Sequence, residues 1–242
     1  MHSIQIKISR FKPGIIDPPA FIAYELTPAP DWTVLDALEQ IRIHQEPSLM
    51  YRRACHHASC GTCACTINGV ERLACETKLA DLGTPVITLE PLRCFERIGD
   101  LVTVRSALFQ FMQPDWSSLQ PDEKRDNHDL LFSGRGQTVT RFENCIECGC
   151  CVCACPVARK NKGFLGPAVL SAVNQEMKKN SSTENDLLTF AAAPDGEPLC
   201  RRALACSRVC PAGVYPARHI KELRDQRNRT GTTPRNRQAP TR

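Results

Sequence analysis

The first 26 residues carry the pattern of two β-strands. In residues 4–8 isoleucine alternates with polar side chains, which is the period of a strand with one buried face. Pro18 and Pro19 predict a turn, because proline fixes φ at a value that suits turn positions. Residues 20–26 then read as the returning strand, so we expect a β-hairpin at the start of the chain.

A helix is predicted next, over residues 33–44. Asp31 is the residue expected to cap its N-terminus. The apolar positions recur at helical spacing and fall on one face, as in an amphipathic helix that packs on a sheet. These positions are Val34, Leu35, Leu38, Ile41 and Ile43.

Two more strand signals follow this helix. Residues 66–67 read as a strand that ends in a turn at Asn68-Gly69, a dipeptide typical of hairpins. Residues 86–89 read as a further strand. A hairpin, a helix, a loop and strands in this order resemble the β-grasp fold of plant-type ferredoxins. We therefore expect a first domain of this kind over residues 1–105, within an α+β chain.

From residue 106 the pattern becomes helical, and we expect a helical second domain that ends at residue 228. Residues 178–198 are polar and contain proline, so they are expected to be a connector. The clearest later helix begins with a proline, which is favoured in the first helical turn. The expected helices are residues 106–112, 121–131, 167–177 and 216–227.

The net charge of +5 comes from the C-terminal end. Residues 221–242 hold seven basic and two acidic side chains, so the rest of the chain is neutral. We expect residues 229–242 to form a basic disordered tail, with contact to lipid headgroups or a partner subunit as the alternative. Nucleic-acid binding is not expected, because no basic patch interleaved with aromatic residues occurs elsewhere.

No apolar stretch approaches the roughly 18 residues needed to span a bilayer. The richest stretch, residues 164–173, is short and broken by Gly166 and Pro167. The N-terminus lacks the apolar run of a signal peptide. The chain is therefore expected in the cytoplasm or on the cytoplasmic side of a membrane, with any membrane association made through partner chains.

Fifteen cysteines add the candidate chemistry. Their C-x2-C runs favour metal over disulfides in a reducing compartment. Two runs follow one template, C-x2-C-x2-C-x3-C-P, whose fourth cysteine binds the other cluster in two-cluster ferredoxins. The second run has Ala203 where its second cysteine would stand. The runs are Cys145, Cys148, Cys151 and Cys155, and then Cys200, Cys206 and Cys210.

Exchange of the fourth cysteines between the runs gives two unequal ligand sets. The set expected for a [4Fe–4S] cluster is Cys145, Cys148, Cys151 and Cys210. The set left over is Cys155, Cys200 and Cys206. Three thiolates fit a [3Fe–4S] cluster, which lacks one iron. Cys150 or Cys153 stays open as a source of the missing thiolate; otherwise both, like Cys94, are read as small core residues.

A third group of cysteines has the plant-type [2Fe–2S] spacing. Gly61 lies inside this loop, where a side chain would crowd the cluster. Cys65 lies two residues further on and is read as a small buried residue of the following strand. The expected ligands are Cys55, Cys60, Cys63 and Cys75.

Tetrahedral thiolate sites also suit zinc. Zinc sites usually show two C-x2-C pairs and four ligands in all. Eleven cysteines in three ferredoxin-like sets favour iron–sulfur clusters instead. An interaction protein held by structural zinc stays as an alternative.

These motifs resemble a family, the iron–sulfur subunits of succinate dehydrogenase and fumarate reductase. The resemblance runs from the first strand to about Leu223, and it includes the non-cysteine residue at position 203. The segments that carry it are TVLDALEQI, YRRACHHASCGTCACTINGVERLAC, CIECGCCVCACP, GFLGPAVL and CRRALACSRVCP.

The resemblance implies a place in an electron-transfer chain. In this family the subunit docks on a flavoprotein subunit with bound FAD, where succinate and fumarate interconvert. Electrons pass between FAD and the [2Fe–2S], [4Fe–4S] and [3Fe–4S] clusters in that order, and the last faces a membrane anchor that binds quinone. The resemblance therefore implies no catalytic residue for the dicarboxylate in this chain.

The departures from the family lie at the quinone end. Many quinone-reducing members have tryptophans soon after the first Cys-Pro pair, whereas this chain has Val-Ala-Arg-Lys at residues 157–160. Many also have a histidine directly after the first cysteine of the second run, where this chain has Arg201. Basic side chains here can donate to a quinone carbonyl, or contact the anchor subunit or lipid headgroups. The candidates are Arg159, Lys160, Arg201 and Arg224. The stretch GFLGPAVL is more similar to fumarate reductases, which often use menaquinol.

Two alternatives keep the clusters but change the setting. Similar subunits serve other flavin-dependent dehydrogenases and the thiol-driven fumarate reductase, which carries a further cysteine-rich domain. A free-standing soluble ferredoxin is the other alternative, although two domains are more than a simple carrier needs. The sequence leaves open the direction of electron flow, the quinone type and the anchor subunits.

Overall fold

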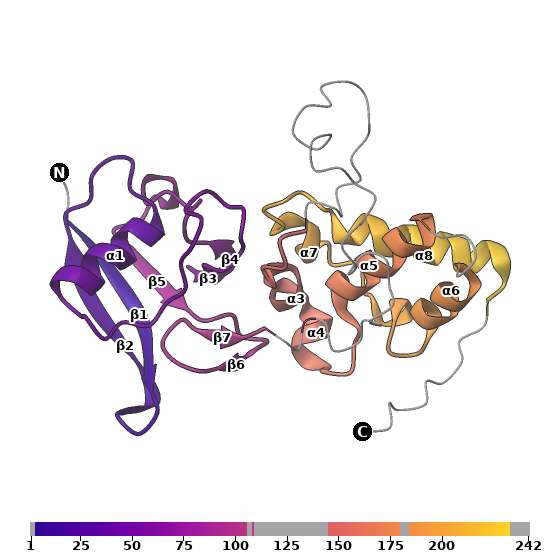
Figure 1. The fold of residues 1–242 in the computed structure, drawn as a ribbon, viewed down its shortest axis with the longest axis horizontal. Coiled ribbons are helices and arrows are strands. Elements are labelled where there is room, and N and C mark those ends of the chain that lie inside the picture. Colours follow the sequence, from indigo (N-terminus) through magenta and orange to yellow (C-terminus); the bar gives the residue numbers. More distant parts are fainter. Residues whose placement is uncertain (1–2, 106–107, 109–144, 180–183, 233–242) are drawn as a thin grey trace, which may run out of the picture.

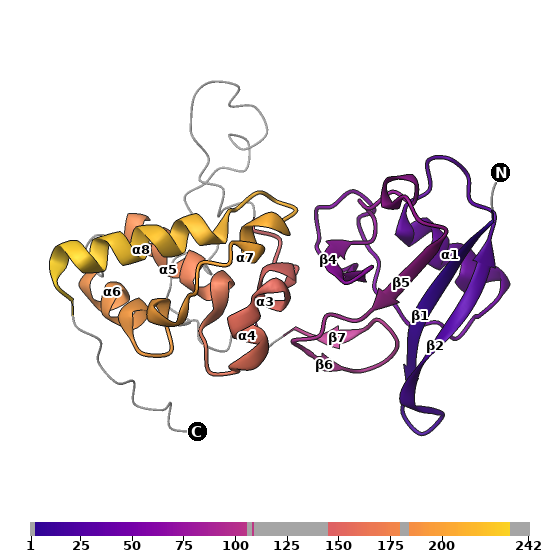
Figure 2. The ribbon, with the colours of Figure 1, turned by 180° about the vertical axis from the view of Figure 1, so that it is seen from behind.

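The computed structural model describes residues 3–105, 108, 145–179 and 184–232. They form a β-sheet domain and a helical domain that lie side by side (Figures 1 and 2). The predicted α+β class is confirmed. Nowhere in these ranges is a helix both long and apolar enough to cross a membrane.

The first domain is built on one five-stranded sheet. Its strands are β1 (Ile4–Lys12), β2 (Ile16–Leu26), β3 (Ala64–Ile67), β4 (Val70–Leu73) and β5 (Val86–Glu90). They lie in the order β2-β1-β5-β3-β4, with β1 and β5 parallel and the other neighbours antiparallel. This mixed sheet around one helix is the predicted β-grasp arrangement, and the turn at Asn68-Gly69 joins β3 to β4 as expected.

Helix α1 (Val34–His44) packs its apolar face on this sheet. The buried side chains of β1 and β5, such as Ile6 and Ile87, meet those of α1, such as Leu38, in one core. Burying such side chains stabilises the domain by roughly 1.5–3 kcal/mol for each large aliphatic residue.

Three local expectations for this domain were wrong. The hairpin turn lies at residues 13–15, where Gly14 has φ +73°, and not at the two prolines. Pro18 and Pro19 lie within β2, which tolerates them because it is an edge strand and they face the register shift between Arg10 and Lys12.

The other two corrections concern α1. Its N-cap is Thr33, not Asp31, because Thr33 and Asp36 form a reciprocal capping box. Ile43, expected on the apolar face, is 64% exposed. Ile43 is the last residue but one of the helix, and the sheet does not cover the helix face at this end.

A small hairpin leads from the sheet toward the second domain. It consists of β6 (Glu96–Arg97) and β7 (Thr103–Val104), and a 3-10 turn, η1 (Ala80–Leu82), precedes β5. The fully buried Arg10 ties this hairpin to β1 through an ion pair with Asp100 at 2.9 Å. Arg105 follows β7 directly, so the position of this residue is fixed from the sheet side.

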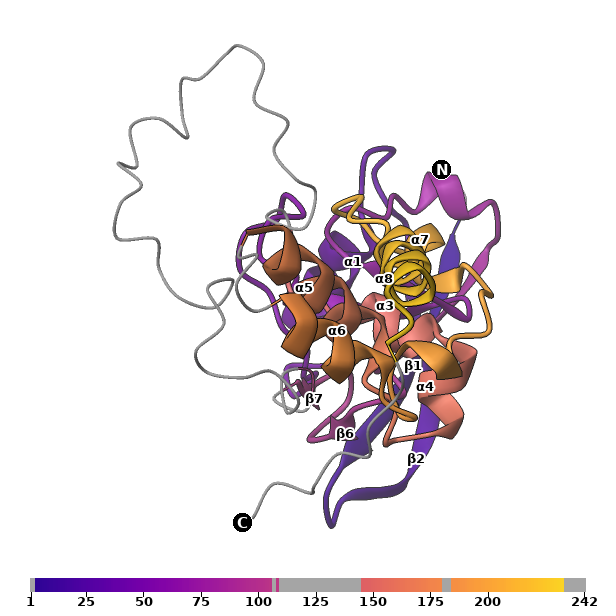
Figure 3. The same ribbon diagram turned by 90° about the vertical axis from the view of Figure 1, so that its right-hand side faces the viewer.

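The second domain is helical, and Figure 3 shows α5, α6 and α8 packed together in front of the sheet domain. Its elements are α3 (Cys150–Ala154), α4 (Pro156–Lys160), α5 (Gly166–Lys179), α6 (Glu184–Ala192), η6 (Glu197–Leu199), α7 (Ala205–Arg208) and α8 (Pro216–Thr230). The predicted helices at 167–177 and 216–227 are therefore confirmed as α5 and α8.

The expected connector at residues 178–198 was wrong. It contains α6, whose apolar residues Leu187, Leu188, Ala191 and Ala192 are buried against α5 and α8. Its four buried positions have helical spacing, but polar neighbours on both sides obscured the pattern.

Helix α3 belongs to the second domain in sequence but packs on both domains, because it contacts α4, α5 and α7 as well as β4. Cys150 and Cys153 are completely buried in the core that also holds Ile6 and Leu89. Across the junction α3 faces β4, as both views of the fold show (Figures 1 and 2).

Some expectations fall outside the described ranges. The helix expected at 121–131, most of that at 106–112 and most of the basic tail lie there. The first two residues of the expected tail, Arg229 and Thr230, belong to α8. The domain boundaries themselves stay predictions.

Candidate metal centres

The first group of cysteines lies in the loop between α1 and β3, with Cys75 just after β4. The backbone N–H groups of Ser59 and Cys60 each donate to Cys55 Sγ at 3.3 Å, and Ala58 N–H donates to Cys75 Sγ at 3.3 Å. Positive φ at His56, Ala58 and Gly61 lets the loop wind this tightly. Backbone N–H groups aimed at sulfur are what a cluster's thiolates require.

All four predicted thiols of this first site converge. Cys55 interacts with Cys60, while Cys75 interacts with both Cys63 and Cys55. The N–H groups of His57 and Cys60 lower the pKa of Cys55 to about 6, which favours the thiolate form. Burial raises the pKa of Cys75 to about 12. A bound iron would offset that cost, because metal coordination deprotonates a thiol.

The second site brings Cys210 to the first run, as the template predicts. The charge of Cys145 interacts with Cys148 and Cys210, and that of Cys151 interacts with all three. Burial raises the pKa of Cys145 to about 11. The neighbouring Cys150 thiol, with added help from the positive charge of Arg105, lowers the pKa of Cys148 to about 7. Four cysteines from two distant segments therefore surround one place.

The third site contains three thiols and a small cavity. The charge of Cys206 interacts with Cys155 and Cys200, and burial raises its pKa to about 11. All three side chains line the cavity together with Ala203, where a fourth thiol is lacking. Residues Arg202 and Leu204 both have positive φ, so the backbone curves around Ala203. This donor set fits a cluster with three cysteine ligands.

The remaining cysteines pack in the core or at its edge. Cys65 is 2% exposed on β3, and Cys150 and Cys153 are fully buried. Cys150 contacts Cys148 and interacts with Cys65, while Cys153 contacts Cys94. Cys150 and Cys153 thus lie in the core of the sheet domain, whereas the third-site cavity lies in the helical domain.

Within the described ranges, no three Cys, His, Asp or Glu side chains are grouped tightly enough to hold a single metal ion. The thiolates of an iron–sulfur cluster are divided among two or more iron atoms, so they need not all meet at one point.

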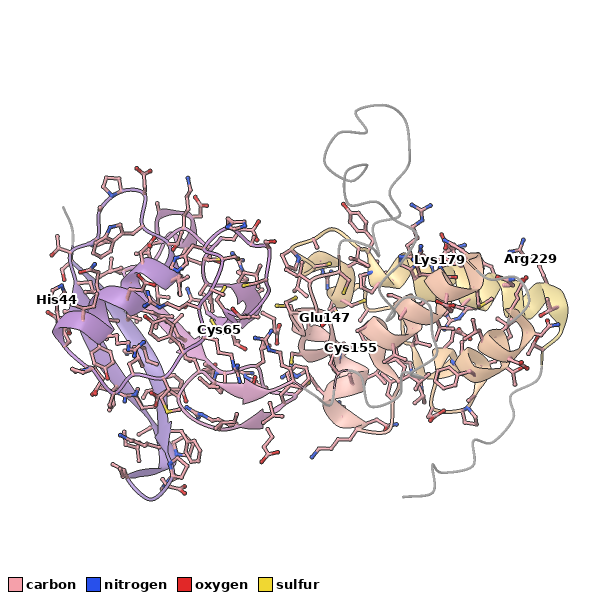
Figure 4. The ribbon with its side chains drawn as sticks, viewed as in Figure 1. His44, Cys65, Glu147, Cys155, Lys179 and Arg229 are labelled. Carbon is pink, nitrogen blue, oxygen red and sulfur yellow. The ribbon has the colours of Figure 1, made fainter. Side chains whose placement is uncertain are left out.

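The first and second sites touch directly. A Cβ atom on Gly61, between Cys60 and Cys63, would lie 2.5 Å from the carbonyl oxygen of Ile146 and 3.0 Å from Cys148 Cβ. The second site also adjoins the third, because the charge of Cys151 interacts with Cys206. Figure 4 shows Cys65, two residues after Cys63, in the sheet domain, and Glu147 and Cys155 in the helical domain. The three sites therefore lie in series.

The basic candidates separate into two kinds. Arg159 and Lys160 are exposed at the end of α4, and Arg201 is exposed beside the third-site cavity. Arg224 is instead paired with the fully buried Glu197 and donates to the carbonyl oxygen of Cys200 at 3.1 Å. Its guanidinium therefore holds a cysteine loop.

The sequence analysis missed two residues beside the sites, Glu197 and Arg105. An acidic residue three positions before Cys200 was a weak signal for the first. Nothing in the local pattern marked Arg105, because its partners are backbone atoms far away in sequence.

The domains match two protein-family models. Residues 5–110 match a 2Fe-2S iron-sulfur cluster binding domain, and residues 141–214 match a 4Fe-4S dicluster domain. The chain is 35% identical over 233 residues to a fumarate reductase iron-sulfur subunit of Mycobacterium tuberculosis, covering 93% of this chain and 92% of that one. The chain belongs to the succinate dehydrogenase and fumarate reductase iron–sulfur subunit family. The predicted resemblance is therefore confirmed.

Other comparisons give further similar proteins. The fumarate reductase iron-sulfur subunit of Wolinella succinogenes is 31% identical, with 91% of this chain and 95% of that subunit covered. A chain of the Mycobacterium smegmatis Sdh1 complex shares the fold, with a TM-score of 0.74 at 23% identity and coverage of 95% and 98%. An uncharacterized iron-sulfur protein of Methanocaldococcus jannaschii is 31% identical over 79% of this chain, which covers 38% of that longer protein.

Proposed function

We propose that this chain is the electron-transfer subunit of a succinate dehydrogenase or fumarate reductase complex. It connects FAD on a flavoprotein subunit with a quinone or menaquinone at a membrane anchor. The chain lies on the cytoplasmic side of the cell membrane. Bound iron–sulfur clusters supply the one-electron chemistry. The interconversion of succinate and fumarate belongs to the flavoprotein, so this chain contributes no catalytic residue to it.

The observation that carries this proposal is the serial order of three thiol sites in one chain. The first site holds the [2Fe–2S] cluster at the loop of the sheet domain. The second holds the [4Fe–4S] cluster at the junction, and the third holds the [3Fe–4S] cluster beside Ala203. Direct contact between the loops of the first two sites, and the interaction of Cys151 with Cys206, give short steps along the series.

The chain's own residues prepare these sites in two ways. Backbone N–H groups directed at Cys55 and Cys75 stabilise the thiolate ligands of the first site. Apolar side chains, including Phe164 and Ile220, line part of the third-site cavity. Charge interactions are stronger beside such apolar surroundings than in water.

At the quinone end, we assign candidate contacts to Arg201, Arg159 and Lys160. Arg201 is the strongest of them, because it is exposed and adjoins the third site. Arg224 acts on the Cys200 loop through its backbone, so we remove it from the contacts expected for quinone.

Low-temperature EPR of the oxidised protein, together with iron and sulfide analysis, tests the proposal. An oxidised [3Fe–4S] cluster has an odd electron, while oxidised [2Fe–2S] and [4Fe–4S] clusters are silent. We expect a signal close to one spin per chain. A silent protein that contains the iron of one two-iron and two four-iron clusters would contradict the assignment of the third site. Zinc in place of iron would contradict the function altogether.

A further inference from the structure

Arg105 makes an unusual set of contacts at the junction of the two domains. Its Nη1 donates to the carbonyl oxygens of Gly61 at 2.7 Å and Cys148 at 3.2 Å. Its Nη2 donates to the carbonyl oxygen of Thr62 at 2.5 Å. One half-buried guanidinium thus holds three carbonyl groups, none of which carries a formal charge.

These carbonyl groups belong to two different cysteine loops. Gly61 and Thr62 lie between Cys60 and Cys63 of the first site, and Cys148 is itself a predicted ligand of the second site. The two loops are also in direct contact, because Gly61 has no side chain to keep Ile146 and Cys148 away. Arg105 therefore contacts the loops of both sites at the place where these loops touch each other.

The position of Arg105 is fixed independently of either loop. It follows β7, and the β6–β7 hairpin is tied to the sheet through the ion pair of Arg10 with Asp100. The carbonyl oxygen of Arg105 also accepts a backbone hydrogen bond from Leu108 at 2.9 Å. The planar fork of arginine serves several acceptors at once, which a lysine ammonium does less well.

We propose that Arg105 is a positioning residue for both of the first two clusters, which clamps their loops together and raises both reduction potentials with one shared positive charge. This inference rests on the cluster assignments proposed above. Reduction adds one negative charge to a cluster, and a nearby cation stabilises that state. The cation lies outside the ligand sphere and acts through the loop backbone and through space.

The test uses the full chain in its loaded form and compares Arg105→Gln with Arg105→Lys. Potentiometric titration followed by EPR gives the midpoint potentials of the first two clusters separately. We expect Arg105→Gln to lower the one-electron reduction equilibrium constant of both clusters about tenfold. This corresponds to a fall of about 59 mV in each midpoint potential. Arg105→Lys keeps the charge, so we expect less than half of that shift.

Arg93→Gln is the matched control. Arg93 is a 44% exposed arginine of the same domain, paired with Glu90, and its removal changes the net charge by the same amount. We expect the reduction equilibrium constants of both clusters to stay within twofold of those of the parent protein. If Arg93→Gln moves them as far as Arg105→Gln does, the effect is one of net charge and the inference is overturned.

Other outcomes also decide the question. Unchanged potentials in a fully loaded Arg105→Gln protein, or a shift confined to one cluster, overturn the shared role while leaving the cluster assignments intact. If Arg105→Gln does not load both clusters, Arg105→Lys decides: retained potentials support the inference and a tenfold fall overturns it. Failure of the parent chain itself to show these clusters would refute the proposed function, not this step.

Discussion

At the scale of single residues, surroundings separate the cysteines that we assign to the clusters from those that only pack. Cys55 accepts two backbone N–H groups and has its pKa lowered to about 6. Cys65, ten residues on, is buried on β3, where burial raises its pKa to about 12. Spacing predicted this division because cluster ligands must come from tight loops, whereas a strand offers its side chains to a core.

Ala203 gives the sharpest test at this scale. It lines the third-site cavity with Cys155, Cys200 and Cys206, at the position where the template has a cysteine. We expect Ala203→Cys to convert the third cluster to a four-iron form. The odd-electron EPR signal of the oxidised protein should then disappear, with about one more iron per chain.

A matched control is Ala80→Cys, which adds a thiol at an exposed position of the other domain. This variant should retain the three-iron signal in full. An unchanged signal in Ala203→Cys would mean that residue 203 does not face the cluster, and that the second cysteine run is aligned wrongly.

His219 predicts a pH effect on stability. Burial is the main cause that lowers its pKa to about 4, and the charge of Lys178 adds to it, while Asn174 Nδ2 lies 2.8 Å from its Nδ1. In the unfolded chain the pKa returns to about 6.5. Between these values the unfolded state binds a proton that the folded state does not, so stability falls as the pH falls.

The slope reaches at most about 1.4 kcal/mol per pH unit, or roughly 2 kcal/mol between pH 6.5 and pH 5. Glu222 faces His219, and its pKa is lowered to about 2. Its contribution to the stability of the folded state is therefore lost only below about pH 4.5. We expect His219→Gln to flatten the dependence of unfolding free energy on pH over 5 to 7, measured by denaturant titration. Equal slopes in both proteins would show that His219 does not titrate as described.

At the scale of elements, period and spacing predicted the parts with local causes. The alternation in β1, the apolar face of α1 and the proline near the start of α5 each left a signal in the sequence. Pro18 and Pro19 misled, since whether a proline ends a strand depends on whether that strand is at the sheet's edge. That fact belongs to the topology and not to the residue.

The candidate sites divide in the same way. Three sets of cysteines were predicted from spacing, since each loop supplies most ligands of its site and the ferredoxin template gives the exchange of the fourth cysteines. Arg105 and the Glu197–Arg224 pair were not, because they act on backbone carbonyl groups of distant loops. Every residue has a backbone carbonyl oxygen, so the sequence cannot indicate which of them accepts a hydrogen bond from an arginine.

At the scale of the whole molecule, the approach of the two domains depends on Gly61. A methyl group there would lie 2.5 Å from a backbone oxygen of the other domain, which cannot move aside as a side chain can. We expect Gly61→Ala to separate the first two sites. The thermal unfolding midpoint should fall, and the magnetic interaction between the two reduced clusters, measured by EPR, should weaken.

Gly69→Ala is the matched control for this change. Gly69 has φ +78°, close to the +66° of Gly61, but a Cβ there would meet nothing within 4 Å. Both variants carry the cost of a left-handed residue, roughly 1–2 kcal/mol. Only Gly61→Ala should alter the magnetic interaction, and an equal effect of the two variants would refute the crowding argument.

The burial of α3 in the first core has a consequence for biosynthesis. Protein chains are made from the amino end, so the sheet domain leaves the ribosome before Cys150 and Cys153 exist. Until those residues arrive, Leu92 and Phe95 lack the contact that Gly149, at the start of α3, makes with them. The leading domain is thus completed by the trailing one, and a nascent chain halted between them exposes the very surface on which the two halves later meet.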